Sequence, residues 1–521
     1  MNLIEKLKGV FRKMLSTKSV ESALKVTPTI SSKMKESLEL WEQMYKDESP
    51  WLSENVKSMG LASLIASEKA RLATIELSVK ITGDSERAKF IEEQFNKVLG
   101  TIRENLEYGI ALGGLIIKPY PVLGPDNKYK IEFSYVKATD FYPLSFSDAG
   151  TLCEVAFIDR IVTKDKVYSK LEHHKLEGNT LTVVNLAYVA ENQNVIVTDC
   201  SELGIPIALT SVPEWASLAE RTIIENVDEN LYAYFKMPLA NTVDLDSPLG
   251  VSGFSRAAQR IKDADEQYSN LLWEFEGGQL AIDVDRTALN PTKDGKGHTV
   301  TVLPKLQDRL FRRNLDLGND DVYEVFSPEL RDQSLINGLN TILMHIEDLC
   351  DLARGTISEV TYAEARTATE LRILKQRSYS ANKDIQTALQ KAFEQTIKVI
   401  DYYCDLYNIV PEGDYEVAYH WDDSIIVDKD AERQVDLLDV DKGLYSRVEY
   451  RMKWRGETRE QALQALKEID EEKMKAMQLQ QSMMMNTQKN GGSTTEATAT
   501  NNKLNRANES LETTNVESKN E

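Results

Sequence analysis

The stretch FSRAAQRIKDADEQYSNLLWEF, residues 254–275, carries the pattern that decides the fold. Its apolar side chains recur at alternating steps of three and four residues, which places them along one edge of a helix. They are Phe254, Ala257, Ile261, Ala264, Tyr268, Leu271 and Phe275. Most of the remaining positions are polar, so this helix needs a partner for its apolar edge.

A second stripe of the same kind lies further along the chain, and a third, weaker one follows it. The second steps by four and three residues in turn, through Leu335, Leu339, Ile342, Ile346, Leu349 and Ala353. The third runs over 371–392, but one of its members is polar and three are only alanine. The first two stripes therefore predict two helices that pack against each other or against neighbours.

Local signals set the expected bounds of these two helices. The first is expected over 251–277, because Gly277-Gly278 stops it. The second is expected over 329–353. Ser327-Pro328-Glu329 supplies a cap, a first-turn proline and an N-terminal acid, and Arg354-Gly355 supplies a C-terminal cation and a glycine.

The segment between the two helices, 278–328, favours strands. Apolar and β-branched runs at 279–284 and 299–303 flank the turn-rich stretch 290–297. A helix that leaves, an insert that contains strands and a helix that returns together predict a rod with a small knob at its far end.

The region before the rod predicts a mixed α and β structure. Helical patterns over 31–108, broken at 82–84, give way to strands such as 130–136 and 180–184. The paired glycines Gly113-Gly114 mark the change from helix to strand.

Helices are also expected after the rod and at the N-terminus. The capping box Thr367-Ala368-Thr369-Glu370 predicts a third and longer helix. Two more helices are expected beyond Tyr403, and from 486 the Asn-, Thr- and Ser-rich composition predicts a disordered tail. Residues 1–15 form a short basic amphipathic pattern, which favours docking on a protein surface over binding to a membrane surface.

Composition argues against several functional classes. The chain has 521 residues, a net charge of −21 and a pI near 4.9, so it is poorly suited to tight binding of duplex DNA. Its four cysteines form no close pair, which argues against a zinc site and a redox dithiol. No apolar run approaches the roughly twenty residues that a membrane helix needs.

No complete catalytic motif is present, and no cofactor is expected. The sequence contains no P-loop, no nucleophile elbow and no zinc-hydrolase motif. Adjacent His173 and His174 fit an exposed polar pair better than a metal site. Asp422 and Asp423 are weak candidates for ligands of a divalent ion, although a solvated acidic surface is the favoured interpretation.

Three groups of motifs resemble the portal proteins of tailed bacteriophages, of the type found in long-tailed phages of Gram-positive hosts. Residues 108–120, with 139–144, are similar to the wing segment of that family. Arg366-Thr367-Ala368-Thr369-Glu370-Leu371 is similar to the family's basic-Thr-Ala-Thr-Glu-aliphatic motif and is the most specific match. Residues 421–426 and parts of 443–458 are similar to its C-terminal portion.

The resemblance implies a portal-type α+β fold with an α+β wing, a two-helix stem, a small strand-containing clip, a long wing helix and a helical C-terminal crown. The implied segments are an N-terminal helical arm 1–52, wing 53–250, outgoing stem helix 251–277, clip 278–328, returning stem helix 329–353, tunnel loop 354–366, long helix and wing return 367–435, crown 436–485 and disordered tail 486–521.

The resemblance also implies a function. A dodecameric ring at one capsid vertex would be the conduit for DNA packaging and ejection, and double-stranded DNA would pass through it without sequence specificity. The implied partners are the large terminase, head-tail connector or adaptor proteins, and the major capsid and scaffolding proteins. The protein would assemble in the host cytoplasm, reside in the virion and contact no membrane. The missing ATPase motif fits a motor that is a separate protein.

Two sets of site residues follow from the same resemblance. The implied tunnel loop carries Arg354, Thr356, Glu359, Tyr362, Glu364 and Arg366, and it lacks the Gly- and Phe-containing stretch expected of the family. The implied stem packing rests on Phe254, Ile261, Tyr268, Leu271, Leu339, Ile342 and Ile346. Arg366 is favoured over Arg354 for contact with DNA or a neighbouring subunit, because Arg354 already suits the C-terminal end of a helix.

Two other classes stay open at this stage. A metal-dependent nuclease would use the cluster around Asp422, and a helical scaffolding or adaptor protein would use the same apolar stripes without enclosing a channel. Rings with a central hole would favour the portal, whereas rods or monomers would favour the others.

Overall fold

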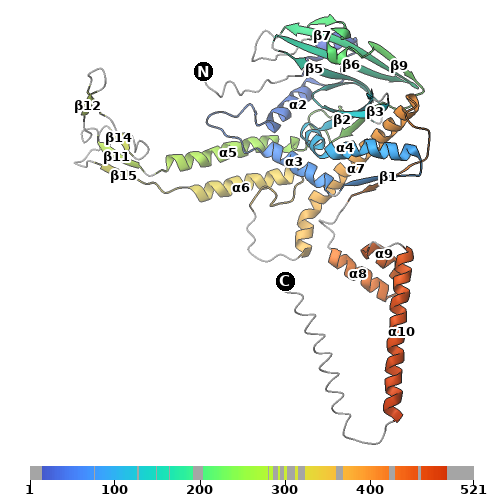
Figure 1. Cartoon of the computed structure of the whole chain (residues 1–521). Coiled ribbons are helices and arrows are strands. Elements are labelled where there is room, and N and C mark those ends of the chain that lie inside the picture. The colour runs from blue at the N-terminus through green and yellow to red at the C-terminus, as the bar shows by residue number, and fades with distance from the viewer. Residues whose placement is uncertain are drawn as a thin grey trace. The chain divides into compact units, whose positions relative to one another are not determined.

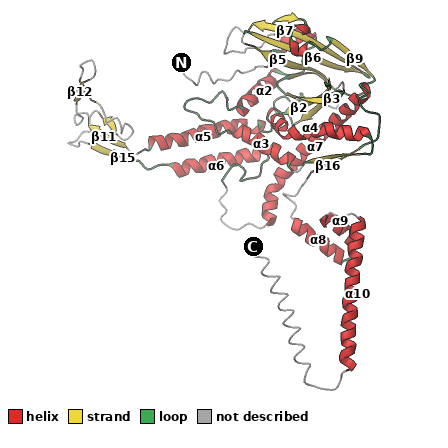
Figure 2. Ribbon diagram, viewed as in Figure 1, coloured by secondary structure: helices red, strands yellow, loops and turns green. Residues whose placement is uncertain are grey.

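The chain forms two compact units, Met1–Ile426 and Val427–Glu521. Both belong to a computed structural model, in which helices combine with largely antiparallel sheets (Figures 1 and 2). The α+β class predicted from the sequence is therefore confirmed. The structure describes residues 14–75, 77–125, 128–147, 150–163, 165–191, 203–279, 281–285, 291–293, 299–301, 311–314, 323–359, 368–421, 429–455 and 459–489.

The helices of the first unit begin where side chains can cap them. Ser16, Ser31 and Ser85 each accept a hydrogen bond from the backbone N–H three residues further on, which satisfies one of the free donors of a helix start. The helices are α1 (Thr17–Leu24), α2 (Ser32–Tyr45), α3 (Leu61–Thr74), α4 (Glu86–Leu112), α5 (Ala258–Gly277), α6 (Asp332–Leu349) and α7 (Ala368–Leu406), with 3₁₀ turns η1 (Leu209–Ser211), η2 (Pro213–Trp215) and η3 (Ser255–Ala257).

The described strands of this unit form five sheets. The largest has the order β4-β5-β6-β7-β8, with β9 also paired to β7, and a second has the order β10-β2-β3. Their strands are β2 (Gly114–Leu123), β3 (Tyr129–Lys137), β4 (Phe141–Phe146), β5 (Leu152–Val162), β6 (Lys166–Glu177), β7 (Thr180–Glu191), β8 (Ile205–Ile207), β9 (Arg221–Glu225) and β10 (Ala233–Lys236). Figure 2 shows these sheets gathered apart from the paired helices α5 and α6.

A two-stranded sheet joins distant parts of the chain and corrects the sequence prediction. The pattern over 31–108 predicts only helices, but β1 (Ser78–Thr82) lies between α3 and α4 and pairs antiparallel with β16 (Glu416–His420). A five-residue strand is too short to show a clear period of its own, and its partner follows more than three hundred residues later. The strand therefore forms because of its partner.

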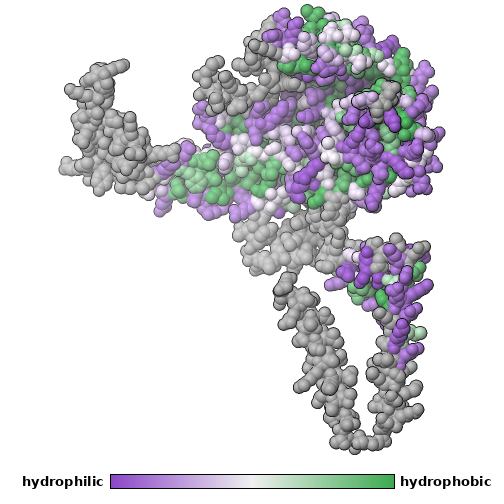
Figure 3. All heavy atoms as spheres, viewed as in Figure 1, coloured by the Kyte–Doolittle hydropathy of each residue, from purple (hydrophilic) through white to green (hydrophobic). Residues whose placement is uncertain are grey.

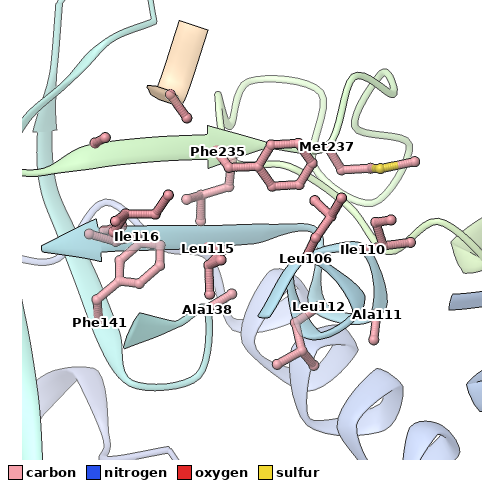
Figure 4. Close-up of a cluster of buried hydrophobic side chains, with 14 of the residues drawn as sticks. Leu106, Ile110, Ala111, Leu112, Leu115, Ile116, Ala138, Phe141, Phe235 and Met237 are labelled. Atoms are coloured by element: carbon pink, nitrogen blue, oxygen red, sulfur yellow. The ribbon is translucent and has the colours of Figure 1, made fainter. Parts of the chain in front are cut away.

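The change from α4 to β2 lies at the centre of the core. Gly113 has a φ of +83°, and a Cβ there would lie 2.6 Å from the carbonyl carbon of Val251, so only glycine fits. Beyond it β2 runs straight into the buried cluster shown in Figure 4. That cluster contains Leu106, Ile110, Ala111, Leu112, Leu115, Ile116, Ala138, Phe141, Phe235 and Met237.

A buried arginine ties the start of α4 to the end of α7. The Arg87 guanidinium is almost fully enclosed and pairs with the carboxylates of Asp401 (2.6 Å) and Asp405 (2.5 Å). It also donates to the backbone carbonyls of Pro411 and Val410. Arginine suits this position because its planar fork can satisfy several acceptors at once.

The long helix α7 begins where the sequence predicts it, although its capping box lies partly outside the described residues. The expected stripe over 371–392 can be compared only from 376, where the side chains of α7 are described. Ile385 and Ala392 are buried as expected, and the packing continues through Leu389, Phe393 and Ile400. Leu371 and Leu374 lie outside the residues whose side chains are described.

The insert between α5 and α6 contains five described strands. They are β11 (Ala281–Asp285), β12 (Pro291–Lys293), β13 (Thr299–Thr301), β14 (Phe311–Asn314) and β15 (Tyr323–Phe326). β11 pairs with β14 and β15, and β12 pairs with β13. The expected turn over 290–297 is thus partly wrong, because residues 291–293 form a strand. β11 and β13 lie within or beside the strands expected near 279–284 and 299–303, of which residues 280, 302 and 303 lie outside the described part.

The second unit contains three described helices, not the two expected. They are α8 (Lys429–Asp441), α9 (Arg447–Arg455) and α10 (Arg459–Lys489). Asp436 of α8 accepts hydrogen bonds from Lys453 and Trp454 of α9, at 2.7 and 2.8 Å. The expected tail from 486 begins too early, because α10 continues to Lys489; residues 490–521 lie outside the described part.

Candidate functional site

The two helices predicted from the apolar stripes are present and pack on each other as a rod, defined here as α5 and α6 (Figure 1). Ile261 and Leu271 of α5 are buried, as are Leu339 and Ile346 of α6. The other three predicted stem residues lie close by: Phe254 is buried just before η3, and Tyr268 and Ile342 are half-buried against the same core.

The outgoing helix starts later than predicted. The expected range 251–277 begins with an irregular segment and η3, and the α-helix proper starts at Ala258. A buried acid on the same face anchors it to an earlier segment, since Asp265 accepts from Trp51 Nε1 (2.9 Å) and from the backbone N–H of Met59 (2.8 Å). Burial raises the pKa of Asp265.

The returning helix also starts later, at Asp332 and not at 329. Glu274 of α5 explains the shift, because its carboxylate accepts the backbone N–H of Arg331 (3.1 Å) and pairs with the Arg331 guanidinium (2.7 Å). These hydrogen bonds hold the pKa of Glu274 below its ordinary value. The chain is therefore fixed at Arg331 by a contact across the rod that no local cap signal reveals.

Part of the apolar surface of the rod has no cover within the described chain. Figure 3 shows green residues gathered over α5 and α6. Trp273 is 66% exposed, Phe275 and Leu330 are each 42% exposed, and Leu349 is 37% exposed. Phe275 and Leu349 belong to the two predicted stripes, so these stripes continue beyond the contact between α5 and α6.

The returning helix ends earlier than predicted, at Leu349 and not at Arg354-Gly355. Asp351 adopts a left-handed φ of +54°, and the Leu352 N–H donates to the carbonyl of Glu347 (2.9 Å). This is the glycine-type C-terminal motif with an aspartate in the left-handed position. The sequence predicts that Gly355 ends the helix. Gly355 also has a left-handed φ, but it lies in the turn that follows the helix end.

Residues 351–359 then fold back along α6, and we call this segment the strap. The fully buried carboxylate of Glu347 accepts the backbone N–H groups of Gly355 (3.1 Å), Ile357 (2.7 Å) and Ser358 (2.9 Å) on one oxygen, and the Ser358 hydroxyl donates to the other (2.7 Å). The strap is thus wrapped around a buried anion, in the manner of backbone nests that bind anions.

A second side chain of α6 holds the end of the strap. Asn340 donates to the carbonyl of Glu359 (2.8 Å) and accepts the N–H of Glu359 (2.7 Å). Asn340 and Glu347 lie seven residues apart on one face of α6, about 10.5 Å along its axis. The strap therefore runs back from the end of the helix to its middle.

Ion pairs connect the strap to α6 and α7. Arg354 pairs with Asp348 (2.7 Å), which lowers the pKa of that carboxyl. Arg377 of α7 pairs with Asp351 (2.9 Å) and lies 3.9 Å from Asp348. Arg354 is consequently engaged at the end of the helix, as its sequence position suggests.

The structure places only half of the predicted tunnel-loop residues. Arg354 is in the ion-pair cluster, Thr356 is exposed and Glu359 is held by Asn340. The other predicted members, Tyr362, Glu364 and Arg366, lie outside the described residues. Sequence reasoning missed Asn340 and Glu347; the available signal was two polar residues seven apart on a helix with an otherwise apolar face.

The predicted metal candidates receive no structural account, because Asp422 and Asp423 lie outside the described residues. Among the residues that are described, no group of three or more His, Cys, Asp or Glu side chains is placed to hold a metal ion. The described helices also include none that is long and apolar enough to cross a membrane.

The interpretation of His173 and His174 as an exposed pair is wrong. His174 is buried and contacts Glu172 (2.7 Å), while His173 contacts Glu154 (2.7 Å). Glu172 also pairs with Lys118 (2.8 Å), and Lys118, Glu172 and His174 line a cavity of about 790 Å³ beside β2, β3 and β6. Burial lowers the pKa of His174. The charges are paired within the wall of the cavity.

Comparison with known proteins gives one informative match. The sequence profile of the family described as "Phage portal protein, SPP1 Gp6-like" matches residues 46–479. No curated protein matches the chain. Among solved structures, a chain from "Neck of native GTA particle computed with C12 symmetry" is similar with a TM-score of 0.35 and 10% identity, over 86% of this chain and 97% of that chain. Likeness at that level leaves the family profile as the basis for the assignment.

Proposed function

The chain belongs to the SPP1 Gp6-like family of phage portal proteins, and on this premise we propose that twelve copies form a closed ring at one vertex of a phage capsid. The ring is the conduit through which double-stranded DNA is packaged and later ejected. The protein resides in the virion after assembly in the host cytoplasm. Its role is structural and not enzymatic.

The exposed apolar face of the rod is the observation that carries this proposal. Trp273 and Phe275 of α5, Leu349 at the end of α6 and Leu330 just before the start of α6 are large side chains left open in the single chain. Single exposed apolar residues are common, but several on a pair of packed helices and the adjoining chain mark an interaction surface. A ring supplies each rod with two neighbours of the same kind, because every subunit in a cyclic assembly contacts the next one.

The charge of the chain suits a conduit. A net charge of −21 repels DNA phosphates, so DNA can slide past without sticking. Local contacts are left to the tunnel loop, 354–366. Arg354 is already paired with Asp348, and this supports Arg366 as the residue of the loop that contacts DNA or a neighbouring subunit.

The proposed partners are those that the resemblance to portal proteins implies. The insert, 278–328, connects the end of α5 to the start of α6, and on this proposal it docks the large terminase and then the head-tail connector or adaptor. The terminase supplies ATP hydrolysis, for which this sequence has no P-loop. The wing and the helical second unit face the major capsid and scaffolding proteins.

Negative-stain microscopy of the purified chain tests the proposal. Rings with a central hole are expected, in a form that matches twelve copies by mass. A field of rods or monomers at concentrations well above those in an infected cell would count against it. Rods or monomers would favour a scaffolding or adaptor protein. Cutting of DNA that depends on divalent ions would instead favour a metal-dependent nuclease.

A further inference from the structure

The strap, residues 351–359, is the part of the molecule that the proposed function leaves unexplained. Its contacts are more numerous than the end of a helix requires. The Leu352 N–H already closes the end of α6 by donating to the carbonyl of Glu347. The hydrogen bonds from Gly355, Ile357 and Ser358 to the Glu347 carboxylate are therefore additional to helix capping.

The contacts of Glu347 are chemically specific. A fully buried carboxylate is costly unless hydrogen bonds compensate for the lost water, and here backbone N–H groups and one hydroxyl do so. Gly355 supports this geometry, because its left-handed φ of +88° lets the backbone turn its N–H inward. The carboxylate and the strap therefore fix each other.

The contact of Asn340 is specific in a different way. Its side-chain amide matches the backbone of Glu359 with one donor and one acceptor, as a neighbouring strand would. It fixes both the position and the direction of the chain at Glu359. Without it, the contacts of Glu347 would hold the strap only as far as Ser358.

We propose that Glu347 and Asn340 are positioning residues that hold the strap against α6 and so set where the rest of the tunnel loop begins. The first half of that loop, through Glu359, is then a fixed bracket beside the middle of α6. The inference rests on the proposed function, in that the loop acts on DNA in the channel.

The test uses the full chain with two substitutions. Glu347→Gln keeps the shape but removes the charge, and Asn340→Ala removes the paired contact with Glu359. Matched controls outside the rod are Glu177→Gln, an exposed residue of β6 that pairs with Lys175, and Asn105→Ala, whose side-chain amide donates to the Thr101 carbonyl on α4. Asn340→Asp keeps the acceptor for the Glu359 N–H and loses the donor, so it is expected to lie between wild type and alanine.

Hydrogen exchange gives a readout that does not depend on DNA. Glu347→Gln is expected to speed exchange of the Gly355, Ile357 and Ser358 amides by about tenfold, because each loses a charge-assisted hydrogen bond. Asn340→Ala is expected to do the same for the Glu359 amide. Ring yield and the thermal midpoint are expected to stay at wild-type values, and both controls are expected to match wild type throughout.

Packaged DNA is the second readout. Particles assembled with either variant are expected to retain less DNA than wild-type particles. Faster exchange with normal packaging and retention would overturn the positioning role and leave the proposed function intact. Unchanged exchange would show that Glu347 and Asn340 do not hold the strap. If ring yield and thermal midpoint fell together with the faster exchange, the two residues would only stabilise the fold, and the positioning role would be overturned. Failure of the wild-type chain to form rings would instead count against the proposed function.

Discussion

Replacing Trp273 with glutamate tests whether the exposed face of the rod joins neighbouring subunits. Trp273 is 66% exposed in the single chain. Covering roughly 150 Å² of it in a neighbour contact is worth about 4 kcal/mol at each interface. Trp273→Glu removes this gain and adds a charge to an apolar contact. The concentration at which rings half-dissociate should therefore rise about a thousandfold, since 1.4 kcal/mol is a factor of ten.

Sedimentation velocity over a dilution series measures that concentration, with negative-stain images as a check on ring shape. The isolated subunit should keep its thermal midpoint, because the side chain that changes is exposed. Leu245→Glu is the matched control: Leu245 is 87% exposed and belongs to the segment between β10 and η3, not to the rod helices. Wild-type dissociation of the Trp273→Glu rings would refute the rod as the subunit interface.

Three further predictions follow from other parts of the molecule. Deleting 290–297 in the insert should leave rings intact and block packaging at the terminase step; loss of the rings would show that the insert belongs to the core. Arg366→Glu should lower the amount of DNA packaged or retained, whereas Arg354→Glu should mainly lower the thermal midpoint, because Arg354 is paired with Asp348. Equal loss of DNA in both variants would contradict this assignment. Burial lowers the pKa of His174 below its ordinary value of 6.5, so the unfolded chain binds a proton that the folded chain refuses. Stability should therefore fall as pH drops below about 6.5, and His174→Gln should flatten the change in thermal midpoint between about pH 7 and 5; an unchanged slope would exclude this residue as the cause.

The rod could be predicted from the sequence because its signal is local and repeated. Stripes with helical spacing on residues such as Ile261 and Ile346 already require two packed helices. The bounds of α6 could not be predicted, because contacts with distant residues set them. Glu274 fixes its start through Arg331, and Asp351 takes the left-handed position that the sequence assigns to Gly355.

The strap shows how much of the candidate site could not be predicted from the sequence. The spacing of Asn340 and Glu347 on an apolar face marks them as unusual, but their residue types do not reveal which groups they bind. Their partners lie between 8 and 19 residues further on and are N–H and C=O groups that every residue carries. Polar residues on a helix are usually solvated. Only the fold distinguishes these two from Asn337, which lies on the same helix and is exposed.

The pairing of β1 with β16 has a consequence for how the protein is made. The two strands join residues 78–82 to 416–420, and the salt bridge from Arg87 to Asp401 connects the same two distant parts of the chain. Contacts so distant in sequence are slow to form, because a long loop must close first. During synthesis, β1 has no partner until the ribosome has passed His420.

The pairing of β1 with β16 also sets the shortest chain that we expect to fold. A chain that stops before 416 lacks β16, and its free strand β1 offers an open edge to other unfinished chains. We expect such truncations to aggregate, while a chain that ends after Trp421 yields a soluble first unit. The delay between translation of β1 and its pairing with β16 then leaves a newly made chain open to aggregation, before it can join the proposed ring.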